Sequence, residues 1–168
     1  MKLTSAAAAK AIKTLEDRKS FLLSTEVNDR EYVQAEDEKA DIPEYSFTDT
    51  NQEIDQIDLK IRTIKHALNV FNTTTVLASG QTIDESLVEM AQLNQKLPRL
   101  SMMRSKQRKR RLNGMETSRR DVAEFENLNY DPKEVEKVYE ENMKRVQQIQ
   151  LALDKVNQTV EFEVEVEL

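Results

Sequence analysis

The chain has 168 residues, of which 38% are hydrophobic and 33% charged, with two glycines, three prolines and a net charge of -6 at pH 7. This balance is typical of long helices that each bury one apolar stripe rather than of a globule with a thick interior. The absence of cysteine excludes disulfides, thiolate metal sites and cysteine nucleophiles. Lys10 and Lys13 interrupt the apolar N-terminal segment, and no later run approaches the roughly 20 apolar residues of a membrane span. We therefore expect a cytoplasmic protein without a membrane segment.

The first predicted helix covers about residues 4–27. Thr4 or Ser5 can cap its N-terminus, because a side-chain hydroxyl accepts a hydrogen bond from an open backbone N–H. Its main apolar positions are Ile12, Leu15 and Leu22. The following residues, 28–48, are acidic and contain Pro43. This segment is predicted to be an extended connector, and its two β-prone pieces could form a short hairpin.

The second predicted helix, about residues 49–72, has the clearest pattern in the chain. Its apolar residues are separated alternately by three and four positions, which is the seam of a coiled coil. They are Ile54, Ile57, Ile61, Ile64, Leu68 and Phe71. Such a seam must be covered by another helix.

A tight turn at Ser79-Gly80 is predicted to end this part of the chain, and Thr82 with Glu85 forms the capping box of a third helix, about residues 82–107. The second and third helices are therefore expected to form an antiparallel hairpin. Pro98 should kink the third helix, because proline removes one backbone hydrogen bond. The apolar stripe of this helix is Ile83, Leu87, Met90, Leu93, Leu97 and Leu100.

The last third of the chain begins with a break at Asn113-Gly114, after which residues 119–130 could include a short strand. Asp131 is predicted to cap a final helix, residues 132–158, with Pro132 at its first position. Its predicted stripe is Val135, Val138, Asn142, Val146, Ile149, Leu153 and Val156.

Residues 159–168 form the C-terminal segment, and within it residues 160–167 alternate apolar side chains with glutamates. This is the period of a strand with one buried face. The strand must pair with one of the β-prone pieces or with a neighbouring subunit, because a single strand is not stable alone.

These elements predict a mainly α protein, a long antiparallel helical hairpin or bundle with short strands, in a single elongated domain over residues 1–168. Three or four helices with one apolar stripe each, together with an exposed alternating strand, also predict a homo-oligomer.

A segment around the predicted turn carries a distinctive pattern of polar and apolar residues. They are Asn69, Asn72, Thr75, Leu77, Gly80, Thr82, Glu85 and Leu87. With these residues the segment resembles an uncharacterised family of small bacterial helical proteins, some of which carry the label septicolysin. Shorter pieces, "MKL", "VQAED" and "LDKVNQTVEF", are also similar. The resemblance implies a small bacterial helical protein and no particular activity.

The sequence contains few residues in patterns that would indicate a catalytic or metal-binding site. His66 is the single histidine and lies off the apolar seam, so we expect it to face solvent. A di-iron bundle site needs two Glu-x-x-His motifs, which one histidine cannot supply. Gly80 and Gly114 are isolated and make no phosphate-binding loop. We predict no catalytic residue, no cofactor and no metal site, and hence a protein that is not an enzyme.

The polar residues around the turn allow two interpretations. They could line a pocket for a polar ligand, or they could hydrogen-bond the open backbone groups at a helix end. The structural interpretation is favoured. The residues of this turn motif are Asn69, Asn72, Thr75, Gly80, Thr82 and Glu85.

A basic segment stands out from the acidic remainder of the chain. Residues 104–120 carry a net charge of +7, so the rest carries -13. Clustered cations could bind the phosphate backbone of nucleic acid or another anionic partner. Alternatively, they could favour the C-terminal end of the third helix and pair with acidic segments of the same chain or of a neighbouring subunit. The second interpretation is favoured, and it predicts a self-assembling structural protein. The cations are Arg104, Lys106, Arg108, Lys109, Arg110, Arg111, Arg119 and Arg120.

Overall fold

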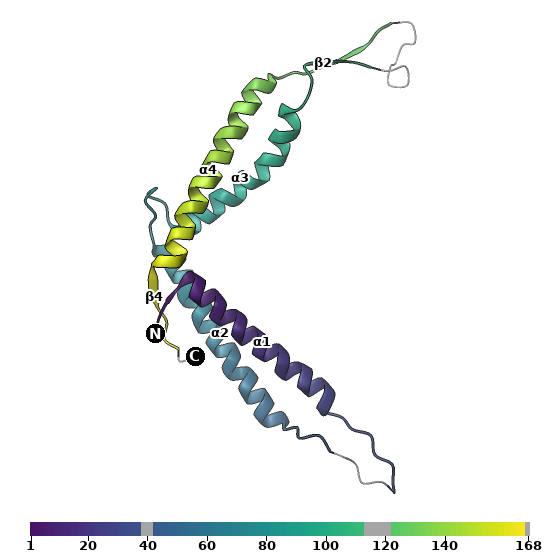
Figure 1. The fold of residues 1–168 in the computed structure, drawn as a ribbon, viewed down its shortest axis with the longest axis vertical. Helices are drawn as coiled ribbons and strands as arrows, with labels where there is room; N and C mark the ends of the chain where they lie inside the picture. Colours follow the sequence, from purple (N-terminus) through teal and green to yellow (C-terminus); the bar gives the residue numbers. More distant parts are fainter. Residues whose placement is uncertain (38–41, 113–121, 167–168) are drawn as a thin grey trace. The chain divides into compact units, whose positions relative to one another are not determined.

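The computed structural model of the protein describes residues 1–37, 42–112 and 122–166. The described chain is mainly α, as predicted, with short antiparallel strands (Figure 1). It divides into two compact units: unit 1 comprises Met1–Thr75 and Asp154–Leu168, and unit 2 comprises Val76–Leu153. The expectation of a single domain stays a prediction. In chain order, the elements are β1 (Lys2–Thr4), α1 (Ser5–Asp29), α2 (Phe47–Thr74), α3 (Ile83–Arg104), β2 (Lys109–Arg111), β3 (Phe125–Asn127), α4 (Pro132–Thr159) and β4 (Glu161–Glu163).

In unit 1, helices α1 and α2 lie side by side (Figure 1). The predicted seam of α2 is confirmed: Ile57, Ile64 and Phe71 are buried, and the intervening apolar residues are half-buried. On α1, the fully buried Ala8 allows the two backbones to come close, because its side chain is small. The expected hairpin of the second and third helices is wrong, since α2 packs against α1 and α3 belongs to unit 2. The seam pattern requires a covering helix but does not specify which one.

Unit 1 is completed by a two-stranded antiparallel ribbon made of β1 and β4, with Leu3 opposite Phe162. Leu3, Phe162 and Val164 are buried, so the predicted alternation with one buried face is confirmed. The Phe162 ring stacks on Phe71 of α2, with 4.8 Å between ring centroids. The strand Glu161–Glu163 is shorter than predicted, and its partner is the N-terminal segment, for which the sequence predicted no strand.

The connector between α1 and α2 contains neither helix nor strand in its described parts, residues 31–37 and 42–46, so no short hairpin is present there. Ser46 caps α2 by accepting a hydrogen bond from the backbone N–H of Asp49 at 3.4 Å. Tyr45 donates its hydroxyl proton to Glu26 Oε1 at 2.5 Å. This bond to a carboxylate raises the pKa of Tyr45, and it ties the end of the connector to α1.

The predicted turn and capping box that begin unit 2 are confirmed. The backbone N–H of Gly80 donates to the Leu77 carbonyl at 2.9 Å, and Gly80 has a φ of +85°, in a region that favours glycine. Thr82 Oγ1 accepts from the Glu85 backbone N–H at 3.2 Å, while Glu85 Oε2 accepts from the Thr82 backbone N–H at 2.8 Å. These hydrogen bonds lower the pKa of Glu85.

Helices α3 and α4 of unit 2 run side by side (Figure 1), and α3 continues through Pro98. Two predicted positions of the apolar stripes are wrong, because Leu87 is 39% exposed and Val138 is 43% exposed. Ser86, at 1% exposure, lies on the buried face of α3 in place of Leu87. Val135, Ile149 and Leu153 are buried as predicted on α4.

The third helix ends at Arg104, not near residue 107, and the basic segment that follows is a strand rather than the end of a helix. Strand β2 pairs with β3, which confirms a short strand within residues 119–130. The predicted break at Asn113-Gly114 lies outside the described residues. Asp131 accepts from the backbone N–H of Lys133 at 2.9 Å, so the predicted start of α4 is also confirmed.

Candidate functional site

The basic segment lies on a β-hairpin of unit 2, which we call the basic hairpin, residues 105–112 and 122–131. Its antiparallel register places Arg110 opposite Glu126. Two further backbone bonds extend the ladder at its ends, from the Leu112 N–H to the Glu124 carbonyl and from the Leu128 N–H to the Arg108 carbonyl, both 3.0 Å. Strand pairing thus brings acidic residues of β3 next to cations that are about 16 residues away in sequence.

Three of the predicted cations pair with carboxylates of the same unit. Arg110 Nε lies 2.9 Å from Glu126 Oε2. Arg104, at the end of α3, donates from Nη1 to Glu136 Oε1 on α4 at 2.7 Å. Arg108 pairs with Asp131, whose pKa is held below its ordinary value mainly by the backbone N–H of Lys133 and also by Arg108.

Two cations also lie over aromatic rings. The Arg104 guanidinium carbon is 3.9 Å from the centre of the Tyr139 ring, and Lys109 Nζ is 4.2 Å from the centre of the Phe125 ring. Both contacts are favourable cation–π arrangements. They cover the ring faces that a nucleic-acid-binding surface would present for stacking on bases.

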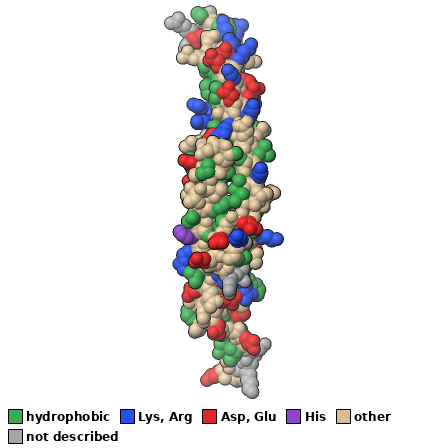
Figure 2. All heavy atoms as spheres, turned by 90° about the vertical axis from the view of Figure 1, so that its left-hand side faces the viewer, with side chains coloured by type: hydrophobic (Ala, Val, Ile, Leu, Met, Phe, Trp, Pro, Cys, Tyr) green, Lys and Arg blue, Asp and Glu red, His purple; other side chains and the backbone are tan. Residues whose placement is uncertain are grey.

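Part of the positive charge has no carboxylate partner. Lys106, Lys109 and Arg111 form no ion pair with the residues that the structure describes. Arg119 and Arg120 lie outside the described residues. On the face drawn in Figure 2, cations and carboxylates are interspersed. Folding of unit 2 therefore pairs half of the six described cations with carboxylates, namely Arg104, Arg108 and Arg110.

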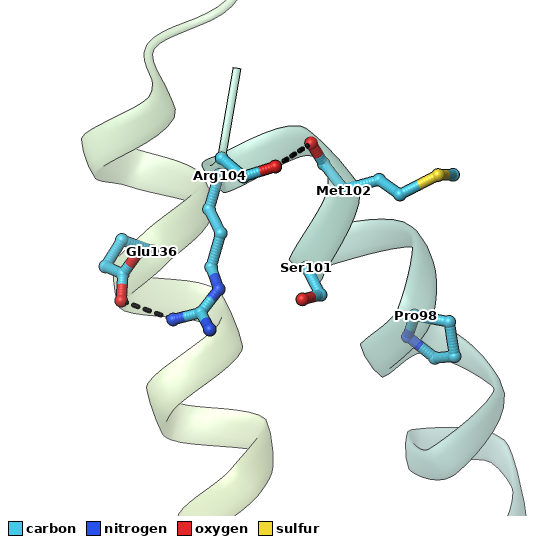
Figure 3. Close-up of a pocket in the computed structure, with 6 residues that line it drawn as sticks. Pro98, Ser101, Met102, Arg104 and Glu136 are labelled. Carbon is cyan, nitrogen blue, oxygen red and sulfur yellow. Dashed lines mark hydrogen bonds and ion pairs between the residues drawn. The ribbon is translucent and has the colours of Figure 1, made fainter. Parts of the chain in front are cut away.

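A shallow pocket of about 480 Å³ lies beside Arg104 (Figure 3). Arg104 reaches across to Glu136 of α4, whereas Met102 points away from that helix. The Ser105 hydroxyl donates to the Met102 carbonyl at 3.0 Å. Because these polar groups already bind one another, the pocket offers little free hydrogen-bonding capacity to a ligand.

The turn motif is built from backbone hydrogen bonds. At the end of α2, the Thr73 hydroxyl donates to the Asn69 carbonyl at 3.0 Å and the Thr74 hydroxyl donates to the Val70 carbonyl at 2.7 Å. The Thr75 backbone N–H donates to the Phe71 carbonyl at 2.9 Å. The Gly80 turn and the Thr82–Glu85 box thus have the predicted structural role, whereas the side chains of Asn69, Asn72 and Thr75 form no hydrogen bond with the residues that the structure describes, so their role stays a prediction.

Sequence reasoning missed a groove in unit 1 between α2 and the C-terminal segment. One cavity, of about 400 Å³, is lined by Ala67, Val70 and Phe71 of α2, by Phe162 and by the polar Thr63, His66, Thr74, Glu163 and Glu165. A second, of about 410 Å³, shares Thr63 and Glu165 with the first and extends along α2 to Gln56. We call this feature the α2–β4 groove. The alternating glutamates of the C-terminal segment were the one feature of the sequence that pointed to this groove, because Glu163 and Glu165 line it.

Other chemistry is sparse in the part of the chain that the structure describes. His66 is exposed, as predicted. Residues 1–37, 42–112 and 122–166 hold no cluster of three potential histidine or carboxylate metal ligands. None of the helices in these ranges is both long and apolar enough to cross a membrane.

Comparison with known proteins identifies a fold. A crystal structure of a functionally unknown conserved protein from Corynebacterium diphtheriae matches with a TM-score of 0.63 at 16% identity, covering 97% of this chain and 100% of that chain. At this identity the likeness shows the fold alone. It gives no information on the activity of either protein. No family model and no curated protein matches the chain.

Proposed function

We propose that this chain is a non-enzymatic structural protein that self-associates through the outer faces of its helices. The observation that carries the proposal is that each unit is a single pair of helices with large apolar side chains on its outside. Stable domains ordinarily bury both faces of such a layer against a second one. A second copy could provide that layer. The outward residues include Phe21, Leu23 and Val27 in unit 1, and Val88, Met102, Val138 and Leu151 in unit 2.

The electrostatics of the basic hairpin support the same proposal. Nucleic-acid affinity depends on cations that are available to neutralise phosphates. Arg104, Arg108 and Arg110 already bind carboxylates of their own unit. These paired cations are less available to phosphates, and such partial matching of charge favours specificity between protein partners over binding to a phosphate backbone.

The mass of the full chain, measured by light scattering after size-exclusion chromatography over a concentration series, tests self-association. We expect an oligomer whose mass falls to that of a monomer in the variant Leu151→Glu, because a charge replaces an apolar side chain that is 71% exposed. Gln107→Glu, at an exposed position between α3 and β2 and outside the helix faces, is the charge-matched control and should leave the mass unchanged. A monomeric wild-type chain at all concentrations would refute the proposal.

Binding to nucleic acid is the outcome that would favour the alternative function. The double variant Lys106→Ala/Arg111→Ala removes two of the three described cations of the basic hairpin that have no carboxylate partner; the third, Lys109, lies over the Phe125 ring. We expect no salt-sensitive binding of a labelled DNA or RNA duplex by the wild type, and hence no change in the variant. Salt-sensitive binding that the variant loses, with unchanged oligomer mass, would assign the site to an anionic partner.

A further inference from the structure

Strand β4 of unit 1 has one open edge. Met1 and Val164 exchange both backbone hydrogen bonds, at 2.7 and 2.8 Å, which marks them as a hydrogen-bonded pair of the antiparallel ladder. Such pairs alternate along the ladder, so the backbone groups of Glu161, Glu163 and Glu165 point away from β1. In the described chain the ribbon has only its two strands, and this edge is unpaired.

The open edge borders the α2–β4 groove. β4 packs against α2, and the groove is lined on one side by Glu163 and Glu165 and on the other by α2. Its apolar part comes from Ala67, Val70 and Phe71 of α2 with Phe162 of β4. Between Gln56 and Thr74 the helix rises about 27 Å, which is the length of roughly eight residues of extended chain.

The charge along this edge is negative. Glu161, Glu163 and Glu165 are exposed at alternate positions, and none forms an ion pair with the residues that the structure describes. Lys2 lies opposite Glu163 on β1, and Lys60 lines the far end of the groove. An incoming strand would therefore meet carboxylates at every second residue, beside a mainly apolar groove.

We propose that the α2–β4 groove binds an extended peptide segment of another protein, which joins the ribbon as a third strand. Backbone hydrogen bonds to the open edge of β4 would hold the segment. Its alternate apolar side chains would contact Ala67, Val70 and Phe71, and the intervening lysines or arginines would pair with Glu161, Glu163 and Glu165. This inference goes beyond the proposed self-association.

The chain's own strands fit the groove less well. A second copy's β4 would place glutamates opposite glutamates, which is unfavourable across a strand pair. A second copy's β2 with the preceding Arg108 would carry cations at four successive positions, so basic side chains would lie over the apolar part of the groove. The groove therefore favours a foreign segment in which apolar and basic residues alternate.

Fluorescence anisotropy with a labelled eight-residue peptide of alternating valine and lysine, added to the full chain, tests the proposal. We expect saturable binding that weakens roughly tenfold in Glu163→Gln/Glu165→Gln, since two opposite-charge cross-strand pairs are lost. Asp17→Asn/Glu44→Gln removes two exposed carboxylates of unit 1 that do not line the groove, and this matched control should bind as the wild type does. Ala67→Trp, which fills the groove, should abolish binding, and circular dichroism checks that each variant is folded.

Three further peptides distinguish strand addition from attraction between opposite charges and from binding of a second copy of this chain. A peptide of the same composition with all lysines in one block, and an alternating peptide with N-methylated amides on the pairing edge, should both fail to bind. Equal binding of either probe, or no binding of the alternating peptide, would overturn the proposal. Tighter binding of a synthetic peptide of residues 103–114 would overturn it in favour of a second copy of this chain.

Discussion

Units 1 and 2 each consist of a helix pair with a two-stranded ribbon, but different interactions stabilise the helix pair within each unit. In unit 1, α1 and α2 come close over an apolar seam that includes Ile64, and the ribbon is fixed by the Phe71–Phe162 stack. In unit 2, α3 and α4 also bury apolar residues, such as Leu93 and Ile149, but a half-buried polar contact joins the two helices as well. Arg145 of α4 binds both carboxylate oxygens of Glu89, at 2.6 and 2.7 Å, and Gln81 at 2.7 Å.

This difference shows how two similar layers can respond differently to solvent. Apolar burial in unit 1 is insensitive to charge state, whereas the half-buried polar bonds of unit 2 depend on ionisation and geometry. The ion pairs of unit 1, such as Arg18–Glu53, are more exposed and contribute little. Unit 1 should therefore be the more sensitive to loss of side-chain volume, and unit 2 to loss of a charged partner.

The largest effect is expected from Ile64→Ala in the seam of unit 1. Ile64 is fully buried, so truncation should leave a cavity and lower the free energy of unfolding by about 2–5 kcal/mol. Urea denaturation followed by circular dichroism measures this change. The control Leu59→Ala, on the same helix but 53% exposed, should change stability by no more than about 0.5 kcal/mol. Equal losses in both variants would show that the seam does not hold α1 against α2.

A smaller effect is expected from Arg145→Met in unit 2. Removing the guanidinium leaves Glu89 without its ionic partner, and because both side chains are partly exposed we expect a total loss of about 1.5–3 kcal/mol in the free energy of unfolding. Urea denaturation measures the difference in free energy of unfolding between the wild type and the variant. Arg18→Met is the matched variant in unit 1 and should cost at most about 1 kcal/mol, because its ion pair is exposed. The reverse order of the two losses would contradict the comparison of the units.

The Arg145–Glu89 contact should also make unit 2 sensitive to acid. Hydrogen bonding to Arg145 holds the pKa of Glu89 below its ordinary value of 4.5. The stabilisation is therefore fully present above the ordinary value and is lost as pH falls through the lowered folded-state pKa. Unfolding free energies of the wild type and Glu89→Gln should therefore converge as the pH falls below the ordinary value of 4.5. A difference that stays constant with pH would show that ionised Glu89 is not stabilising.

The smallest effect is expected at the helix starts. Thr82→Ala breaks a reciprocal capping box in unit 2 and should cost about 1 kcal/mol, measured as a lowered melting temperature. Thr4→Ala removes the simpler cap of α1, in which the hydroxyl accepts only from the Ala7 N–H at 3.2 Å, and should cost less. A larger loss for Thr4→Ala would mean that the carboxylate of Glu85 adds nothing to the cap.

Local signals in the sequence predicted the helices and their starts well. The spacing that includes Ile57, Ile64 and Phe71 determined the seam of α2, and Thr82 with Glu85 determined the start of α3. The errors arose at positions where burial of a side chain depends on residues far away in the sequence. Leu87 and Val138 fit an ideal helical period, yet Ser86 is buried because the contact with the facing helix selects the face.

The candidate site was less predictable than the fold. Cations after α3 suit the end of a helix, so the basic segment was expected to be helical. Pairing of β2 with β3 depends on a contact between Arg110 and Glu126, which no local pattern indicates. The α2–β4 groove was missed for a similar reason, since the alternation of the C-terminal segment predicts a buried face but not the strand or helix beside it.

The pairing of β1 with β4 has a consequence for the order of folding. Leu3 and Phe162 are almost the full length of the chain apart, so their contact closes a very large loop, whereas each helix pair closes a much shorter one. Contacts of high sequence separation form late. During synthesis on the ribosome, β1 must wait until α4 has been made before its partner exists. The ribbon of unit 1 should therefore form last, after the helices that carry it.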